Sequence, residues 1–449
     1  MEIADMKVIP SRFQPKYFKK FTDFFKYFLI ALLLLTSFRF LAYGNNPEVI
    51  VQPEWTADLQ AIAKPVVTDK QLFVVSHMKF SELEIGESIP AELVALDLAS
   101  GKILWQQKLP PSELNARHQL ILDNGTIYAS HANGVVGFET ETGALKTSLK
   151  YTEFVHSGIS DLTIGISQDI AVYGDSIPID ENYSNRGFQT KLFGINKERT
   201  LWSYQLPKTN GLIGLSGIQP VIQNGILFLP SFHDTSAGRI EQFTVIDVQS
   251  GKVLWSWEAP QKPNGLWSAN IFEDTIYTSV YGNSEMRPSG KLRSINLKTG
   301  KEKWSYVITG KVKAVSDREV FVWQSKGNSG SNFVVLDKDT GKFLRRFSLN
   351  RVNDSEPPNL TLADSLMYIP DMEIKNVTLG FYGSADNNSW VSAFDEKTGK
   401  LVWRTPTILN SHIYHEPVIS KGSSPKRLIF ASNFLRQDGN SKVQSFLIP

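Results

Sequence analysis

Residues 244–255 read TVIDVQSGKVLW, and residues 94–105 repeat the pattern as VALDLASGKILW. Further copies read SINLKTGKEKW at 294–304, VVLDKDTGKFLR at 334–345 and AFDEKTGKLVW at 393–403. In each copy an apolar strand leads into an Asp- or Asn-led turn, which closes on Ser/Thr-Gly before a second strand. The carboxylate or amide can bond its own backbone in such a turn, and glycine adopts the positive φ that other residues resist. The pattern therefore predicts one β-hairpin that recurs along the chain.

Two degenerate copies lie between the good ones. Residues 136–147 keep Gly143 but have Thr147 at the tryptophan place, and residues 193–202 keep Trp202 but lose the glycine. With Trp55 included, the tryptophan place falls at positions 55, 105, 147, 202, 255, 304, 345 and 403, with gaps of 41 to 58 residues. Two more apolar strands precede each copy. A self-similar unit of this length, made of strands and turns, is typical of propeller blades.

Eight tryptophan places predict an all-β fold, an eight-bladed β-propeller of four-stranded antiparallel blades over residues 54–449. After Trp403 only three apolar strands remain. We therefore expect the strand around Trp55 to complete the last blade by pairing near Phe446, which also protects the sheet edges. Seven blades is the alternative count.

The first 44 residues differ from the rest in charge and hydropathy. They hold seven Lys/Arg against three Asp/Glu and an apolar run from Tyr27 to Phe38. This predicts either a cleaved signal peptide, with Ala42-Tyr43-Gly44 at the cleavage site, or a signal-anchor hydrophobic helix over 24–43. Both interpretations send the propeller across the membrane, to the periplasm or cell surface, as a secreted or single-pass anchored protein. Residues 45–53 are then a short tether.

Composition excludes several classes of function. The formal net charge is +2, and residues 45–449 carry 40 Lys/Arg against 42 Asp/Glu, so we expect no nucleic-acid partner. The chain has no cysteine. Disulfide frameworks, thiolate zinc sites, iron–sulfur clusters and cysteine nucleophiles are therefore excluded.

Taken as a set in register, the copies resemble the pyrroloquinoline-quinone (PQQ)-like propeller repeat over essentially residues 50–449. In that family the indole stacks on backbone near the repeat glycine of a neighbouring blade, which implies a structural role for the repeat residues. Those residues are Trp55, Gly101, Trp105, Gly143, Trp202, Gly251, Trp255, Gly300, Trp304, Gly341, Gly399 and Trp403. The family holds quinoprotein alcohol dehydrogenases and non-catalytic exported propellers, such as the lipoprotein of the outer-membrane β-barrel assembly machinery.

The chain resembles the dehydrogenases in its repeat but lacks the adjacent cysteines found in them. Those enzymes have an adjacent-cysteine disulfide on the quinone, calcium ligands and a catalytic aspartate, whereas this chain has no cysteine and is shorter. We therefore expect no enzyme activity, no catalytic residues, no cofactor and no metal. The repeat aspartates should be spread round the disc, and His412 and His415 should point to opposite sides of an extended chain.

Loop lengths point to a binding face. Turns between third and fourth strands are tight, whereas the connections between second and third strands are long. The long connections cover 80–91, 173–189, 231–241, 281–290, 324–332, 371–389 and 433–441. Insertions confined to one end mark a binding surface. We expect a scaffold that binds another membrane or extracytoplasmic protein, or a ligand, there. The candidate contacts are Trp267, Tyr281, Tyr382, Trp390 and Tyr414. The alternatives are a PQQ-dependent dehydrogenase and an extracytoplasmic sugar- or polymer-binding module.

Overall fold

The structure is a computed structural model whose residues Ile50–Pro449 form one compact unit, described here by itself. It describes residues 49–77, 91–110, 119–131, 134–150, 162–167, 169–178, 188–196, 199–206, 220–235, 238–258, 266–280, 290–325, 331–349, 360–374, 387–420, 422, 425–433 and 441–448. The expected leader and hydrophobic helix, residues 1–44, lie outside these ranges. Within them no helix has the length and hydropathy needed to cross a membrane.

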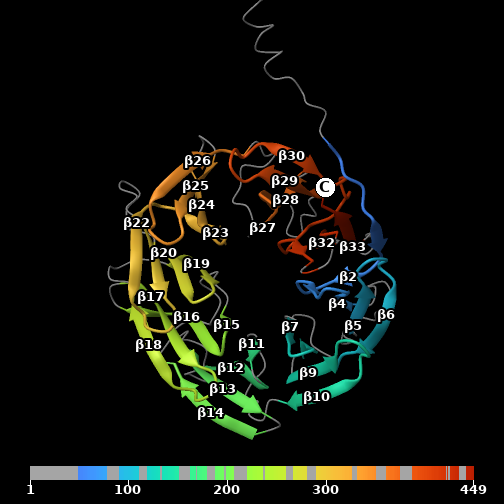
Figure 1. The fold of residues 1–449 in the computed structure, drawn as a ribbon. Helices are drawn as coiled ribbons and strands as arrows, with labels where there is room; N and C mark the ends of the chain where they lie inside the picture. The colour runs from blue at the N-terminus through green and yellow to red at the C-terminus, as the bar shows by residue number, and fades with distance from the viewer. Residues whose placement is uncertain are drawn as a thin grey trace, which may run out of the picture. The chain divides into compact units, whose positions relative to one another are not determined.

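The described strands form eight separate antiparallel sheets, which confirms the eight-bladed count and excludes seven (Figure 1). Blade 1 comprises β2 (Gln60–Ala61), β3 (Val66–Val67), β4 (Gln71–His77), β5 (Ala91–Asp97) and β6 (Ile103–Lys108). Blade 2 comprises β7 (Leu120–Asp123), β8 (Thr126–His131), β9 (Gly134–Glu139) and β10 (Leu145–Lys150). Blade 3 comprises β11 (Leu162–Ser167), β12 (Ile170–Pro178), β13 (Phe188–Asn196) and β14 (Arg199–Gln205). Blade 4 comprises β15 (Val221–Gln223), β16 (Ile226–Thr235), β17 (Gly238–Asp247) and β18 (Val253–Glu258).

The remaining blades follow the same order. Blade 5 comprises β19 (Leu266–Phe272), β20 (Thr275–Val280), β21 (Lys291–Asn296) and β22 (Glu302–Val307). Blade 6 comprises β23 (Lys311–Val315), β24 (Glu319–Ser325), β25 (Ser331–Asp337) and β26 (Phe343–Phe347). Blade 7 comprises β27 (Thr361–Ala363), β28 (Leu366–Ile374), β29 (Asn387–Asp395) and β30 (Leu401–Arg404). Blade 8 comprises β31 (Val418–Ile419), β32 (Arg427–Ser432), β33 (Lys442–Leu447) and, as its outer strand, β1 (Trp55–Ala57).

Blade 8 closes the ring with both ends of the described chain. Trp55 lies opposite Ser445 in the β1–β33 pair, as the sequence predicted. Just before β1, the Glu54 carboxylate accepts two hydrogen bonds from the Arg427 guanidinium, at 2.7 and 3.0 Å. Val51 donates its backbone N–H to the Arg404 carbonyl oxygen at 3.0 Å, so part of the expected tether is already bound to blade 7.

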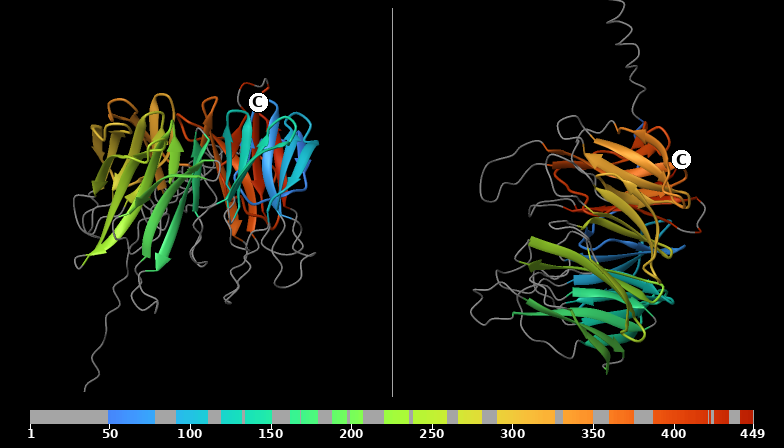
Figure 2. Two further views of the ribbon diagram at one scale, coloured as in Figure 1. Left: turned by 90° about the horizontal axis from the view of Figure 1, so that it is seen from below. Right: turned by 90° about the vertical axis from the view of Figure 1, so that its left-hand side faces the viewer.

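Each sheet is covered on both faces, which explains the consecutive apolar residues in the strands. On β4, Phe73 and Val75 pack in a cluster with Ile127 of blade 2. Leu72 and Val74, on the other face of β4, pack in a cluster with Ile429 of blade 8. Apolar clusters between neighbouring blades therefore make up the core. Figure 2 shows the blades from the side, with their strands running between the two ends of the ring.

Seven outer strands carry the same irregularity directly before the tryptophan place. In blade 1, Trp105 lies opposite Ala95 and Ile103 opposite Leu96, so Leu104 is an extra, bulged residue. The bulged residues are Leu104, Lys146, Leu201, Leu254, Lys303, Leu344 and Val402. A bulge re-aims the next side chain and disrupts an exposed strand edge.

The two ends of the blades differ. We call the end with the third-to-fourth strand hairpins the tight-turn end, and the opposite end the long-connection end. At the latter, β12–β13, β16–β17 and β28–β29 stay paired out to Pro178↔Phe188, Thr235↔Gly238 and Ile374↔Asn387. The long loop predicted over 231–241 is therefore wrong, because strand pairing continues through it and leaves only residues 236–237 between the strands.

Candidate functional site

The repeat aspartates build turns at the tight-turn end. Asp97 Oδ1 accepts hydrogen bonds from the Ser100 N–H at 2.8 Å and from the Ser100 hydroxyl at 2.6 Å. The hydroxyl bond is the main cause that holds the pKa of Asp97 below its ordinary value. Thr340 and Thr398 act likewise on the pKa values of Asp337 and Asp395. These carboxylates thus accept hydrogen bonds within their own turns.

The repeat tryptophans join each blade to the next. Trp55 Nε1 donates to the Leu98 carbonyl at 3.0 Å, and a Cβ built on Gly101 would lie 2.6 Å from the same indole. Gly101 also has a φ of +69°, so both the close approach and the backbone conformation require glycine. The other indole–carbonyl bonds are Trp105–Thr140 (2.9 Å), Trp202–Val248 (2.8 Å), Trp255–Leu297 (2.9 Å) and Trp304–Lys338 (2.7 Å). Gly143, Gly251, Gly300 and Gly341 receive the corresponding indoles.

Three seams depart from this rule. Between blades 2 and 3, Thr147 stands at the tryptophan place and has no indole to donate. Arg345 stands at the tryptophan place of blade 6, where its guanidinium lies 5.8 Å from the Phe321 ring and donates to the Glu396 carbonyl at 2.9 Å. Phe347 takes over the cover of Gly399. At the last seam, Trp403 is buried, but its Nε1–H has no partner among the described residues, since blade 8 has no third-to-fourth strand hairpin there.

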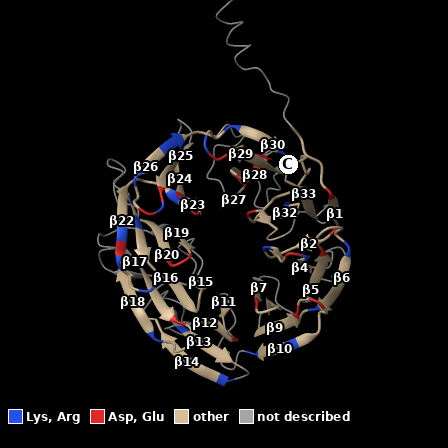
Figure 3. Ribbon diagram, in the orientation of Figure 1, with Lys and Arg blue, Asp and Glu red and all other residues tan. Residues whose placement is uncertain are grey.

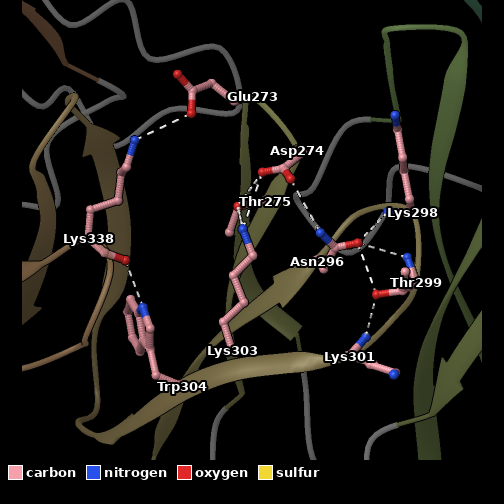
Figure 4. A network of polar contacts seen from close by, with 10 residues as sticks. All are labelled: Glu273, Asp274, Thr275, Asn296, Lys298, Thr299, Lys301, Lys303, Trp304 and Lys338. Atoms are coloured by element: carbon pink, nitrogen blue, oxygen red, sulfur yellow. Dashed lines mark hydrogen bonds and ion pairs between the residues drawn. The ribbon is translucent and has the colours of Figure 1, made fainter.

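Ion pairs strengthen some seams of the tight-turn end (Figure 4). In blade 5, Lys303 pairs with Asp274 at 3.2 Å and donates to the Thr275 hydroxyl at 2.6 Å. Lys338 of blade 6 reaches back to Glu273 at 3.4 Å, beside the Trp304 bond to its own carbonyl. Round the ring, basic and acidic residues are interspersed (Figure 3). Most of the polar contacts described at the tight-turn end thus join residues of the same blade or of neighbouring blades.

The five candidate contacts do not form one cluster. Trp267 lies within strand β19, not in a loop. Trp390 lies within β29 and is buried, with Nε1 bonded to the Ser392 hydroxyl at 3.0 Å and Arg404 over its ring, so its expected loop position is corrected. Tyr414 is 48% exposed. Tyr281 and Tyr382 lie outside the described residues.

Tyr414 belongs to the link between blades 7 and 8, residues 405–417, which folds back over the long-connection end of β29. Ile408 and Ser389 exchange backbone hydrogen bonds of 2.8 and 3.0 Å, and the Ser389 and Ser411 hydroxyls are 2.5 Å apart. His412 exchanges two 2.8 Å backbone bonds with Asn433 of blade 8. The link is therefore fixed to both blades.

The link presents apolar and ionisable side chains. Leu409 is 65% exposed, and the Tyr414 ring centroid lies 4.1 Å from that of His412. Burial lowers the pKa of His412 and of His415. Burial alone would raise the pKa of Glu416, but the Lys64 ammonium at 2.6 Å, together with a backbone hydrogen bond and His415, holds that pKa below its usual value. No pattern in the sequence indicates this ion pair, because its two residues lie 352 positions apart.

The described ranges contain no group of three or more His, Asp or Glu side chains placed to hold a metal ion.

Comparison with known proteins places the fold in a class. A family model described as "Outer membrane protein assembly factor BamB" matches residues 48–267 and 188–322, which together span more than half of the chain. The chain belongs to this family of propellers built from PQQ-like repeats.

The relatives and solved structures that are similar to this chain include enzymes. The chain is 24% identical over 217 residues to the dehydrogenase subunit of a quinone alcohol dehydrogenase from Gluconobacter oxydans, covering 43% of this chain and 27% of the relative. It is 28% identical over 181 residues to the quinohemoprotein alcohol dehydrogenase ADH IIB of Pseudomonas putida, covering 38% and 24%. The chain thus spans about a quarter of the length of each relative. The quinohemoprotein alcohol dehydrogenase of Comamonas testosteroni shares the fold, with a TM-score of 0.50 and 10% identity, covering 89% of this chain and 76% of that one.

These matches contradict the prediction that the chain is not an enzyme. That prediction depended on the missing cysteines and the short length, yet these relatives are dehydrogenases. At this low identity the matches show a shared repeat and fold, and they do not show an activity.

Proposed function

We propose that this chain is an exported PQQ-like propeller that acts as a scaffold and binds another extracytoplasmic or membrane protein at its long-connection end. The observation that carries the proposal is the difference between the two ends. Glycine-closed turns and indole bonds occupy the tight-turn end. At the other end three sheets project as paired strands and the link of residues 405–417 is built across two blades.

The chemistry of this link suits a protein partner. Leu409 and Tyr414 are exposed, while the backbone that carries them is held by hydrogen bonds to β29 and to Asn433. Apolar and aromatic anchors on a preordered backbone, with polar groups around them, are typical of interface centres. Because little ordering is needed on binding, less affinity is lost to conformational entropy.

Export is supported by the basic flank and apolar run of residues 1–44. The family model carries the name of an outer-membrane assembly factor, which fits a location outside the cytoplasm. We propose that residues 24–43 anchor the chain to the membrane when they are not cleaved.

Photo-crosslinking in native membranes tests the scaffold function. A crosslinker at position 409 or 414 should capture one discrete partner, which Leu409→Ser with Tyr414→Ala should release. Leu145, 62% exposed at the tight-turn start of outer strand β10, is the matched control position and should capture no such partner. Equal capture from all three positions, or none from the first two, would refute the proposal.

The curated relatives favour quinone-dependent alcohol oxidation as a second candidate function. Purified full chain incubated with PQQ and calcium is assayed for dye-linked alcohol oxidation. Turnover above that of a boiled sample supports this candidate, and absence of turnover across primary alcohols excludes it.

A further inference from the structure

One level of cross-strand pairs at the long-connection end is polar in nearly every blade. In each blade, one residue of the second strand lies in register with the tryptophan place. The pair in question lies three residues beyond it, as Ser76 lies three residues beyond Phe73. We call it the polar level. Its pairs are Ser76↔Glu92, His131↔Gly134, Asp175↔Lys191, Ser231↔Gln242, Val280↔Lys291, Gln324↔Asn332, Asp371↔Trp390 and Ser432↔Lys442.

Buried members of the polar level usually have protein partners. The Ser76 hydroxyl donates to the His77 carbonyl at 3.3 Å, and the Ser432 hydroxyl to the Lys442 carbonyl at 3.4 Å. Asn332 Oδ1 accepts from the Ser348 hydroxyl at 2.5 Å, and Asp371 Oδ1 accepts from the Met372 N–H at 3.1 Å. Satisfaction within the protein is therefore the pattern at this level.

Blade 4 breaks this pattern with both members of its pair. Ser231 and Gln242 are 3% and 7% exposed, and neither Ser231 Oγ nor Gln242 Nε2 has a hydrogen-bond partner in the part of the chain that the structure describes. They are direct cross-strand partners, which places their Cβ atoms about 5 Å apart on one face of the sheet. Two adjacent buried donors without an acceptor are costly, and a bound molecule that accepts from them is one explanation for such groups in native proteins.

The surroundings define the guest. On the same face of β16, Leu227 and Leu229 pack with Val172 and Leu206 of blade 3. The register partner of Gln242 on β18 is the acidic Glu258, so these neighbours supply no cation. A carboxylate there would lose its hydration without a counter-charge. A neutral carbonyl oxygen has two lone pairs and can accept from both donors.

We propose that Ser231 and Gln242 form a subsite that binds one uncharged carbonyl oxygen, of a peptide or a small amide, between blades 3 and 4. The subsite goes beyond the proposed scaffold function, because the link of residues 405–417 takes no part in it.

Two small probes, one neutral and one anionic, test the charge of the guest. N-methylacetamide and acetate are titrated into the full chain labelled with ¹⁵N-glutamine, and the Gln242 side-chain signal is assigned with Gln242→Met. N-methylacetamide should shift this signal with a saturating curve, and acetate should not. Ser231→Ala should weaken N-methylacetamide binding at least fivefold.

Ser76→Ala is the matched control, because it removes a polar-level hydroxyl that already has a partner, and it should leave the titration unchanged. Ser231→Ala and Gln242→Met remove unpaired donors and should not lower the denaturation midpoint, so lost binding would not reflect unfolding. Equal shifts with acetate, no shift with either probe, or unchanged affinity in Ser231→Ala would each overturn the proposal. A peptide partner would show the same Ser231 dependence as the free amide, whereas a site for free amides only would bind N-methylacetamide and reject capped tripeptides.

Discussion

Replacing the indole at two different seams distinguishes the contribution of its hydrogen bond to stability from that of its ring packing. Trp304 and Trp403 are both buried, at 8% and 2% exposure, and each packs against a tyrosine ring at 5.9 and 5.8 Å. Trp304 Nε1 donates to the Lys338 carbonyl at 2.7 Å, whereas Trp403 Nε1 has no partner among the described residues. Trp304→Phe and Trp403→Phe therefore replace similarly buried indoles by a smaller ring, but only Trp304→Phe removes a hydrogen bond.

The expected difference follows from burial. Loss of part of the indole should cost about 1–2 kcal/mol in either variant. Trp304→Phe additionally leaves a carbonyl unsatisfied, at about 1–3 kcal/mol, while Trp403→Phe removes a donor that was already unpaired. We expect Trp304→Phe to lower the free energy of unfolding by about 2 kcal/mol more than Trp403→Phe.

Urea denaturation followed by far-ultraviolet circular dichroism measures both variants without relying on tryptophan fluorescence. Equal losses, or a larger loss in Trp403→Phe, would refute the view that the indole N–H bonds hold the blades together.

Three further predictions concern a buried tyrosine hydroxyl, a partly buried ion pair and the carboxylate of a repeat turn. Tyr368 is fully buried with an unpaired hydroxyl, and Phe73, Phe228 and Phe321 occupy its register position in other blades, so Tyr368→Phe should raise the free energy of unfolding by about 1 kcal/mol. Tyr128→Phe, which loses a 3.3 Å bond to Asp169, should lower it instead. Glu54→Ala leaves the Arg427 guanidinium, only 9% exposed, without its carboxylate and should cost about 3 kcal/mol by urea denaturation. Asp364→Ala, which breaks an exposed pair with Lys426, should cost less than about 1 kcal/mol, and equal costs would contradict the argument. Because the Thr340 hydroxyl lowers the pKa of Asp337, the stability from this turn is present above the unfolded pKa and lost as pH falls through the folded value; Thr340→Val should raise that pKa in a ¹³C-carboxyl NMR titration.

The repeat could be predicted because its signal is local. The Asp97 carboxylate, the Ser100 hydroxyl and Gly101 lie within five residues and build one turn, so their spacing in the sequence carries the geometry. Closure through Trp55 and Ser445 followed from counting the strands left after Trp403. Both inferences needed no knowledge of side-chain contacts across the ring.

The bulges and the long-connection end depend on contacts that spacing does not show. Leu104 and Leu254 read as ordinary strand residues, yet the next residue must turn towards the neighbouring glycine, and a bulge provides that turn. The Ser231↔Gln242 pair continues a strand through what reads as a polar loop. Trp390 reads as a loop aromatic, but Arg404 and Ser392 cover it.

At two of the three seams without a tryptophan bond, other contacts replace it. Between blades 6 and 7, Arg345 reproduces both the ring contact and the carbonyl bond, and it adds an ion pair with Glu319 at 2.5 Å. Between blades 7 and 8, the Val51 bond to Arg404 and the Lys426–Asp364 pair span the seam where the Trp403 N–H is unpaired. These replacements lie outside the link of residues 405–417, which adds its own backbone bonds to β29 and to Asn433. Stability is thus supplied largely at the tight-turn end, because its turns are fixed by repeat chemistry. The long-connection end is left free to carry residues, such as Tyr414 and Gln242, that the fold itself does not need.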